Sequence, residues 1–161
     1  MAAAHLGSVH GVQDAARRAQ SEVQDALRSG QHLFTTLGMT DVDAEGADLA
    51  VLLPVSPRLA NSRGALQGGM IATLIDVVAG RLAMDGVEAG HSSATNDMNI
   101  HYLAPIVVGP ARAEGTVLRR GRRSVVVHVD VWAVATDRRA AVGTVSFTVL
   151  APRADGDGEP G

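Results

Sequence analysis

The segment Gly69–Met84 constrains the fold more than any other part of the chain, because the helix that it predicts is apolar on nearly every side. Only Asp76 and Arg81 interrupt it with a charge. A helix on the surface of a globular protein carries polar residues along one face. We therefore expect this helix to be buried all round. Its apolar stretch is shorter than the roughly 20 residues that cross a bilayer, so no membrane span is expected.

Alternation of apolar and polar residues, typical of strands with one buried face, surrounds this helix. The expected strands cover residues 33–43 and 49–53 before the helix, and 95–102, 111–118, 125–133 and 141–149 after it. Glu45-Gly46 forms the first turn, and a loop over 56–66 follows Pro54. Short connections in the second half favour an antiparallel meander. A sheet wrapped around one buried central helix satisfies both elements, which gives an α+β fold.

The two ends of the chain lack the strand pattern of the part between them. Residues 1–11 predict a flexible N-terminus that lacks the features of a secretory signal, so a cytoplasmic protein is expected. Helical spacing over 12–29 predicts an extra peripheral helix. Residues 151–161, rich in Gly, Pro and acidic side chains, predict a disordered tail. A single domain over residues 12–150 is expected.

The composition excludes several functions. Because 46% of residues are hydrophobic and only 19% are charged, against about 25% in an average chain, apolar surface remains for a partner subunit. The net charge of -3 and the 2% of aromatic residues argue against nucleic acid as a partner. Cysteine and lysine are absent, which excludes disulfides, thiolate metal sites and Schiff-base chemistry. The 6 histidines lack metal-binding spacing, so no metal site is expected.

Asp76 is the residue of the central helix that needs an explanation. It stands between Leu74-Ile75 and Val77-Val78, and no basic residue lies three or four positions away. Burial of an unpaired carboxylate is costly or raises its pKa. Either the helix has one exposed line on which Asp76 lies, or the carboxylate occupies an apolar cleft as a base or nucleophile. The apolar neighbours favour the cleft.

Gln67, Gly68 and Gly69 stand where this helix begins. Backbone N–H groups at a helix start lack partners within the helix, so they can stabilise negative charge that develops on an oxygen. Paired glycines let a ligand approach that backbone closely, although they also occur in plain tight turns. Asn61 adds a side-chain amide in the loop just before them.

Two stretches resemble the hotdog-fold acyl-CoA thioesterases of the phenylacetate-pathway and 4-hydroxybenzoyl-CoA type. The first, which resembles their signature, is Asn61-Ser-Arg-Gly-Ala-Leu-Gln-Gly-Gly-Met-Ile-Ala-Thr-Leu-Ile-Asp76. The second, which resembles the strand after their central helix, is Thr95-Asn-Asp-Met-Asn-Ile-His-Tyr-Leu-Ala-Pro105. The resemblance covers residues 33–150 and implies the hotdog fold. It departs at Gln67, where that family usually has a histidine.

The resemblance also implies roles for four residues. Asn61 and the Gly68 N–H would orient and polarise the thioester carbonyl. Asp76 would activate water or attack directly, and Thr95 would hold the acid or the water. Gln67, Gly69 and Tyr102 are expected along the substrate. Tyr102 is also the inward residue of its expected strand, so a place in the core is the alternative interpretation for it.

An arginine turn is the candidate for binding the phosphates of CoA. It comprises Arg119, Arg120, Gly121, Arg122, Arg123 and Ser124. Guanidinium groups bind phosphate with charge-assisted hydrogen bonds, and the resemblance favours this role. A solvated hairpin turn is the alternative interpretation. Arg58 and Arg63, which flank Asn61, are weaker candidates for the same task.

The spacing along the helix predicts a site shared by two subunits. Gly68 and Asp76 are eight residues apart, which puts them about 12 Å apart along a helix axis. A general base has to come within about 3 Å of its proton or act through one water. We therefore expect a homodimer in which one subunit supplies Asn61 and Gly68 and the other supplies Asp76 and Thr95. The resemblance extends this to a homotetramer.

The expected function is hydrolysis of an acyl-CoA thioester to a free acid and CoA, without a metal or redox cofactor. One alternative is a noncatalytic acyl-CoA-binding hotdog protein, which the glutamine at position 67 makes conceivable. A second is a hydratase or dehydratase, which pairs a histidine with an acid, whereas the central helix contains no histidine. A third is a purely structural module. The acyl group that would be bound cannot be predicted from the sequence.

Overall fold

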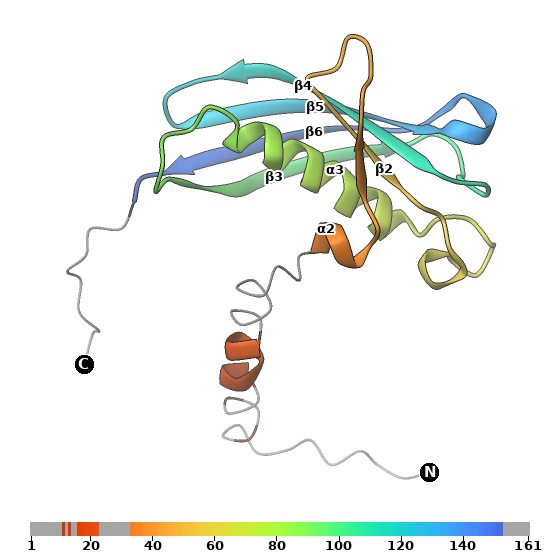
Figure 1. Ribbon diagram of the computed structural model, residues 1–161, viewed down its shortest axis with the longest axis horizontal. Coiled ribbons are helices and arrows are strands. Elements are labelled where there is room, and N and C mark those ends of the chain that lie inside the picture. The colour runs from red at the N-terminus through yellow and green to blue at the C-terminus, as the bar shows by residue number, and fades with distance from the viewer. Residues whose placement is uncertain (1–10, 12, 14–15, 23–32, 153–161) are drawn as a thin grey trace. The chain divides into compact units, whose positions relative to one another are not determined.

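Figure 1 shows the computed structural model, which describes residues 11, 13, 16–22 and 33–152. The chain forms two compact units, Met1–Leu37 and Gly38–Gly161. In the first unit, residues 16–22 are helical, as predicted. The other parts of the helix expected over 12–29 fall mainly outside the described residues, and so do residues 1–10 and 153–161 of the two expected flexible ends.

The strand predicted over residues 33–43 is wrong for its first half. Leu33–Thr36 forms a short helix, α2, in which the Leu37 N–H donates to the Leu33 carbonyl at 3.0 Å. Gly38 follows with φ of 66°, a left-handed conformation that interrupts any regular element. Only Thr40–Val42 forms a strand, β1. The alternation of residues could not reveal this break, because it reports side chains and not backbone torsions.

The second unit contains an antiparallel sheet of six strands. After β1 come β2 (Leu49–Leu53), β3 (Ser92–Tyr102), β4 (Ala111–Arg120), β5 (Ser124–Ala133) and β6 (Arg138–Leu150). Their order across the sheet is β1-β2-β4-β5-β6-β3. The predicted meander is therefore right for β4, β5 and β6. It is wrong for β3, which pairs with β6 at the far edge of the sheet.

The connection over residues 103–110 explains the place of β3. Three strand spacings, about 14 Å, separate β3 from β4 in the sheet. A connection of this length can cover about 26 Å when extended, so it can carry the chain across the sheet. Sequence order alone could not distinguish this crossing from a hairpin. As a result, the two edge strands of the sheet differ: β1 is short, whereas β3 is long and mostly exposed.

The central helix, α3, covers Gly68–Met84 and runs across one face of the curved sheet (Figure 1). Its buried residues recur every three or four positions, so they form one stripe. They are Ile71, Leu74, Ile75, Val78, Ala79, Leu82 and Ala83. The stripe packs on valines of the sheet such as Val127, Val129 and Val131, which are fully buried.

Within one chain, the prediction that the central helix is buried all round is wrong. Ala72, Thr73, Asp76, Val77 and Gly80 are only half-buried on the side of α3 away from that stripe. The physical reason is geometric, because a single sheet covers one side of a helix and the other side requires a second body. This uncovered side, Ala72 to Gly80, is called the open side of α3 below. Within the described residues, no helix is long and apolar enough to cross a membrane.

Candidate active site

The first turn of α3 offers two backbone donors. The Gln67 carbonyl accepts the N–H groups of Met70 and Ile71 at 2.8 and 3.3 Å, and no side chain caps the helix. Among the described residues, the N–H groups of Gly68 and Gly69 have no acceptor. Both sit at the end of the helix where its dipole is positive. They are therefore suited to bind an oxygen on which negative charge develops.

Asn61 is held in a closed turn just before the helix. Its side-chain oxygen Oδ1 accepts the N–H groups of Arg63 at 2.9 Å and Ala65 at 3.2 Å. Its backbone N–H donates to the Ala65 carbonyl at 2.7 Å, and Gly64 takes the left-handed φ of 75° that closes the turn. With Oδ1 occupied by the backbone, the Nδ2 group is the part of this side chain that remains for a ligand.

A hollow of about 330 Å³ brings these donors together. Its lining includes Asn61, Leu66, Gly68, Ile71, Tyr102 and Pro105. Tyr102, on β3, donates its hydroxyl to the Gly68 carbonyl at 3.0 Å. The structure thus places three of the predicted site residues, Asn61, Gly68 and Tyr102, around one apolar-walled space. We call this space the donor hollow.

Asp76 and Thr95 form a second group. The Thr95 hydroxyl donates to Asp76 Oδ1 at 3.1 Å, from β3 to the open side of α3. A β-bulge follows directly, because Thr95 pairs with Phe147 but Asp97 pairs with Ser146. Bulges re-aim neighbouring side chains and often occur beside active sites. Within one chain Asp76 is half-buried, so the deep apolar cleft predicted for it is not present there.

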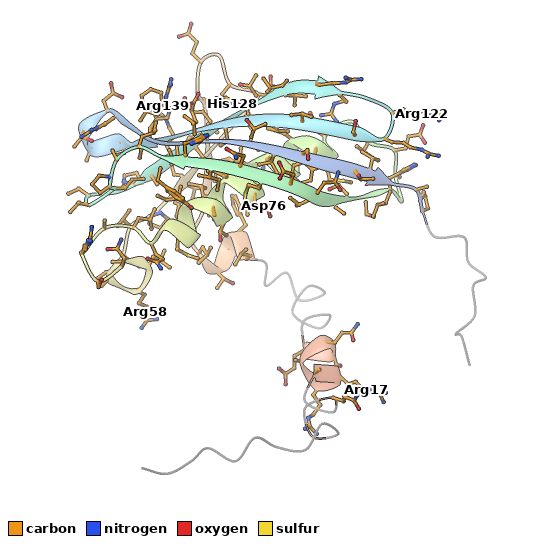
Figure 2. All side chains as sticks on the ribbon, turned by 180° about the vertical axis from the view of Figure 1, so that it is seen from behind. Arg17, Arg58, Asp76, Arg122, His128 and Arg139 are labelled. Atoms are coloured by element: carbon orange, nitrogen blue, oxygen red, sulfur yellow. The ribbon has the colours of Figure 1, made fainter. Side chains whose placement is uncertain are left out.

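The two groups are not united within one chain. Eight residues of α3 separate Gly68 from Asp76, which is about 12 Å along the helix axis. The donor hollow is lined by residues around the start of α3, and Asp76 is not among them. Figure 2 shows Asp76 between Arg58 and Arg122, which lie toward opposite ends of this unit.

The arginine turn lies at the other end of α3. The guanidinium of Arg120 donates to the carbonyls of Leu82 at 2.6 Å and Ala83 at 3.2 Å. It thereby caps the C-terminal end of the helix, where basic side chains are favourable. Gly121 donates its N–H to the Ser124 carbonyl at 2.8 Å, which closes the turn. Arg119, Arg122 and Arg123 are exposed.

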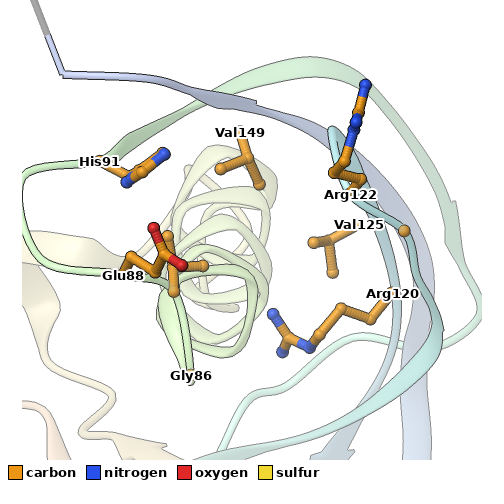
Figure 3. Close-up of a pocket in the computed structure, with 9 residues that line it drawn as sticks. Gly86, Glu88, His91, Arg120, Arg122, Val125 and Val149 are labelled. Atoms are coloured by element: carbon orange, nitrogen blue, oxygen red, sulfur yellow. The ribbon is translucent and has the colours of Figure 1, made fainter.

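A cavity of about 390 Å³ lies beside this turn (Figure 3). Glu88, His91, Arg120 and Arg122 contribute its polar lining, and Val125 and Val149 contribute apolar walls. Within the described residues, no cluster of three or more His, Asp or Glu side chains could hold a metal ion. The cavity combines two guanidinium groups and one carboxylate with apolar surface.

Comparisons with known proteins agree on one family. Over 124 residues the chain is 30% identical to acyl-coenzyme A thioesterase 13 from Homo sapiens, covering 76% of this chain and 88% of that protein. The sequence pattern of the thioesterase superfamily matches residues 63–139. The chain belongs to the thioesterase superfamily. The matched residues begin within the Asn61 turn and include α3, so they contain much of the candidate site.

The chain aligns with solved structures over most of its length. A Bacillus halodurans protein, in a crystal structure with CoA, aligns with a TM-score of 0.69 at 28% identity, covering 85% of this chain and 94% of that one. A thioesterase from Haemophilus influenzae aligns with a TM-score of 0.69 at 20% identity, covering 76% and 85%. The latter likeness concerns the fold alone. The prediction of a hotdog fold is confirmed.

Sequence reasoning missed several features of this thioesterase site. It did not predict that Arg120 caps α3 or that Glu88 and His91 line the adjacent cavity. A basic residue near a helix C-terminus is a known signal, but Arg120 lies 38 residues from Leu82 in the chain. Gln67 and Gly69 are exposed at the start of α3, as are Arg58 and Arg63 in the loop before it.

Proposed function

We propose that this thioesterase hydrolyses an acyl-CoA to a free acid and CoA at a site shared by two copies of the chain, with Asp76 promoting the attack and no metal or redox cofactor taking part. The observation that carries the proposal is the division of the machinery, because the chain separates unpartnered donors in one hollow from a carboxylate held by Thr95. The names of its relatives support the substrate class: one is an acyl-coenzyme A thioesterase, and another was crystallised with CoA.

The donor hollow binds the thioester carbonyl. The Gly68 N–H and the Asn61 Nδ2 group donate to its oxygen, which becomes negative when the carbon is attacked. Donors held in place before the reaction stabilise that charge without reorganisation. The closed turn of Asn61 supplies such rigidity on one side of the hollow.

Asp76 acts on the carbonyl carbon. Thr95 holds Oδ1, which leaves Oδ2 to take a proton from water or to attack the carbon itself. With water as the nucleophile, its oxygen bonds to the carbon, the C–S bond breaks, and the thiolate of CoA receives the proton that Asp76 took. With Asp76 as the nucleophile, Oδ2 bonds to the carbon and the C–S bond breaks, so that an anhydride forms and the thiolate of CoA leaves and takes a proton from solvent. Water then hydrolyses the anhydride, which releases the free acid and restores the Asp76 carboxylate. The position of the carboxylate permits both routes.

A second copy of the chain completes the site. Two surfaces are available for it: the open side of α3 and the long exposed edge of β3. If two copies pair with their α3 helices antiparallel, Gly68 of one helix comes opposite Asp76 of the other. A dimer of this kind also covers the half-buried residues of α3 and surrounds Asp76 with apolar side chains. Pairs of such dimers would form the tetramer expected from the resemblance.

The arginine turn binds the CoA phosphates for the copy that supplies Asp76. From Asp76 to Ala83, where Arg120 caps α3, the distance along the helix axis is about 10 Å, whereas from Gly68 it is about 22 Å. Arg119, Arg122 and Arg123 keep their guanidinium groups exposed for the phosphates. Arg120 holds the turn against the helix, and the hydroxyl and backbone of Ser124 complete it.

The test is a panel of acyl-CoA substrates with a thiol reagent that reports released CoA. We expect turnover of at least one substrate, and Asp76→Asn should lower kcat by about 10²- to 10⁴-fold while the substrate still binds. Asp43→Asn makes the same charge change in an exposed loop and should keep full activity. Binding of acyl-CoA without release of CoA by the natural chain would favour the noncatalytic alternative instead.

A further inference from the structure

The two glycines at the start of α3 make its donors hard to hold in place. Gly68 and Gly69 lack Cβ atoms, so their backbone has more conformational freedom than that of other residues. The helix also lacks a side-chain cap at this end. Oxyanion donors are effective only when their direction is fixed before the reaction. The fold therefore has to restrain this turn from outside the helix.

We propose that Tyr102 is a positioning residue that restrains Gly68, and with it the amide groups on both sides of its Cα, from the neighbouring strand. Tyr102 ends β3, where it pairs with Ala141 of β6, so its backbone is fixed by the sheet. The inference rests on the proposed function, in which those amide groups polarise the thioester carbonyl.

Two contacts carry this restraint. The Tyr102 hydroxyl donates to the Gly68 carbonyl at 3.0 Å. In an α-helix that carbonyl already accepts the N–H four residues ahead, so the tyrosine supplies a second donor from another element. The ring also lies against the glycine, since a Cβ built on Gly68 would be 3.5 Å from Tyr102 Cε1 and 3.6 Å from Cζ. Hydrogen bond and ring together limit rotation of the peptide groups next to Gly68.

The same contacts argue against two other roles for Tyr102. A core residue would be buried, whereas Tyr102 is 54% exposed and lines the donor hollow. A tyrosine hydroxyl has one proton to donate, and here the Gly68 carbonyl accepts it. The hydroxyl therefore cannot also donate to the thioester oxygen while this bond is kept. Its effect on the reaction passes through the glycine.

Tyr102→Phe tests the proposal because it removes the hydroxyl and keeps the ring. We expect a five- to tenfold lower kcat, which corresponds to the loss of one ordinary hydrogen bond, with KM changed by less than twofold. Thr136→Val is the control. It removes a hydroxyl that donates to the Ala133 carbonyl at 3.4 Å in the turn between β5 and β6, so no hydrogen bond to α3 is lost. This control should keep the kcat of the natural chain.

Backbone dynamics give a readout that needs no substrate. In Tyr102→Phe, but not in Thr136→Val, the amide protons of Gly68 and Gly69 should exchange with water faster or show NMR exchange broadening. An unchanged kcat, a raised KM with unchanged kcat, or unchanged amide exchange would overturn the proposal. If the natural chain cleaves no acyl-CoA, the proposed function fails, and the amide measurement still decides whether Tyr102 restrains the turn.

Discussion

Asn61 offers one side-chain atom to the fold and another to the proposed reaction. Oδ1 accepts two backbone N–H groups and so closes the turn, whereas Nδ2 takes no part in the turn, and Asn61 lines the donor hollow. The two tasks need different chemistry, because the turn requires an acceptor and the thioester oxygen requires a donor. Substitutions can therefore separate them.

Asn61→Asp keeps the acceptors and replaces the donor with a negative charge. We expect a Tm within about 2 °C of the natural chain and a kcat lower by at least about 10²-fold, as when an oxyanion donor is removed. Asn61→Ala also loses the turn, so its Tm should fall by several degrees as well. Thermal unfolding followed by circular dichroism and acyl-CoA kinetics provide both values. Full activity in Asn61→Asp would show that Nδ2 plays no part.

At this scale, the sequence predicts residue types better than contacts. The motif from Asn61 to Asp76 is local in the chain, so the candidate side chains within it can be chosen from the sequence alone. The bond from Tyr102 to Gly68 spans 34 residues, and that from Arg120 to Leu82 spans 38. Such contacts depend on which strand crosses which end of α3. No local pattern contains that information.

The close packing of α3 on the sheet depends on a glycine in β4. A Cβ built on Gly115 would lie 2.6 Å from both Val78 Cγ1 and Leu82 Cδ1, much closer than atoms can approach. Both side chains belong to the buried stripe of the helix. Glycine in a strand often marks such a close approach of a neighbouring element. At this place the helix and the sheet leave no room for a methyl group.

Gly115→Ala should therefore destabilise the fold by about 1–3 kcal/mol, the usual cost of overpacking a core. Urea unfolding would measure this as a lower midpoint at an unchanged m-value. Gly80→Ala, in α3, is the control. Its added Cβ would meet only Phe147 ring carbons, at 3.7 and 3.9 Å, which is ordinary van der Waals contact. Equal midpoints for Gly115→Ala and the natural chain would contradict the packing argument.

An ion pair ties the short strand β1 to α3. Arg81 donates from both terminal nitrogens to the Asp41 carboxylate, at 2.6 and 2.8 Å. The hydrogen bond from Arg81, aided by its charge and opposed by partial burial, lowers the pKa of Asp41 below its ordinary value of 3.8. A lowered folded-state pKa means that the pair stabilises the fold above that ordinary value. The contribution is lost as the pH falls through the lowered pKa.

Asp41→Asn should consequently lower the Tm at pH 7 by about 2 °C, since both side chains are largely exposed and such pairs contribute little. The difference from the natural chain should shrink as the pH falls below 3.8 and through the lowered pKa of Asp41. Thermal unfolding over this pH range is the measurement. Asp43→Asn, in the loop after β1, is the charge control and should keep the Tm of the natural chain at pH 7. A difference that stays constant as the pH falls would exclude the ion pair as its cause.

Helices and strands were predicted well wherever the local periodicity of apolar residues determines their bounds. The helix expected over 69–84 begins one residue earlier, and β2 has the predicted ends. The prediction of a strand was wrong for residues 33–36, because Thr35 and Thr36 favour strands by propensity, whereas the chain forms a helical turn there. The predicted position of β3 in the sheet was wrong for another reason. Its pairing with β6 is a long-range contact, and the periodicity within a strand carries no information about its partner.

At the scale of the whole molecule, the described residues leave two surfaces uncovered. The open side of α3 leaves Ala72, Val77 and Gly80 half-buried, and β3 has an unpaired edge. The unpaired backbone groups of a long exposed strand edge can pair with a strand of another chain. Asp76 lies beside both surfaces, whereas the donor hollow lies around the start of α3. A partner that covers both surfaces would bring the two groups together.

Mixed dimers provide the decisive test of this shared site. Asp76→Asn and Asn61→Asp should each be inactive when expressed alone, because every site then lacks one group. When the two variants are coexpressed, a mixed dimer has one site with both defects and one intact site. Random pairing makes half of the dimers mixed, so the preparation should regain about one quarter of the natural activity. Size-exclusion chromatography would verify that all samples are equally assembled. If each chain worked with its own Asn61 and Asp76, coexpression would restore no activity, and the shared site would be excluded.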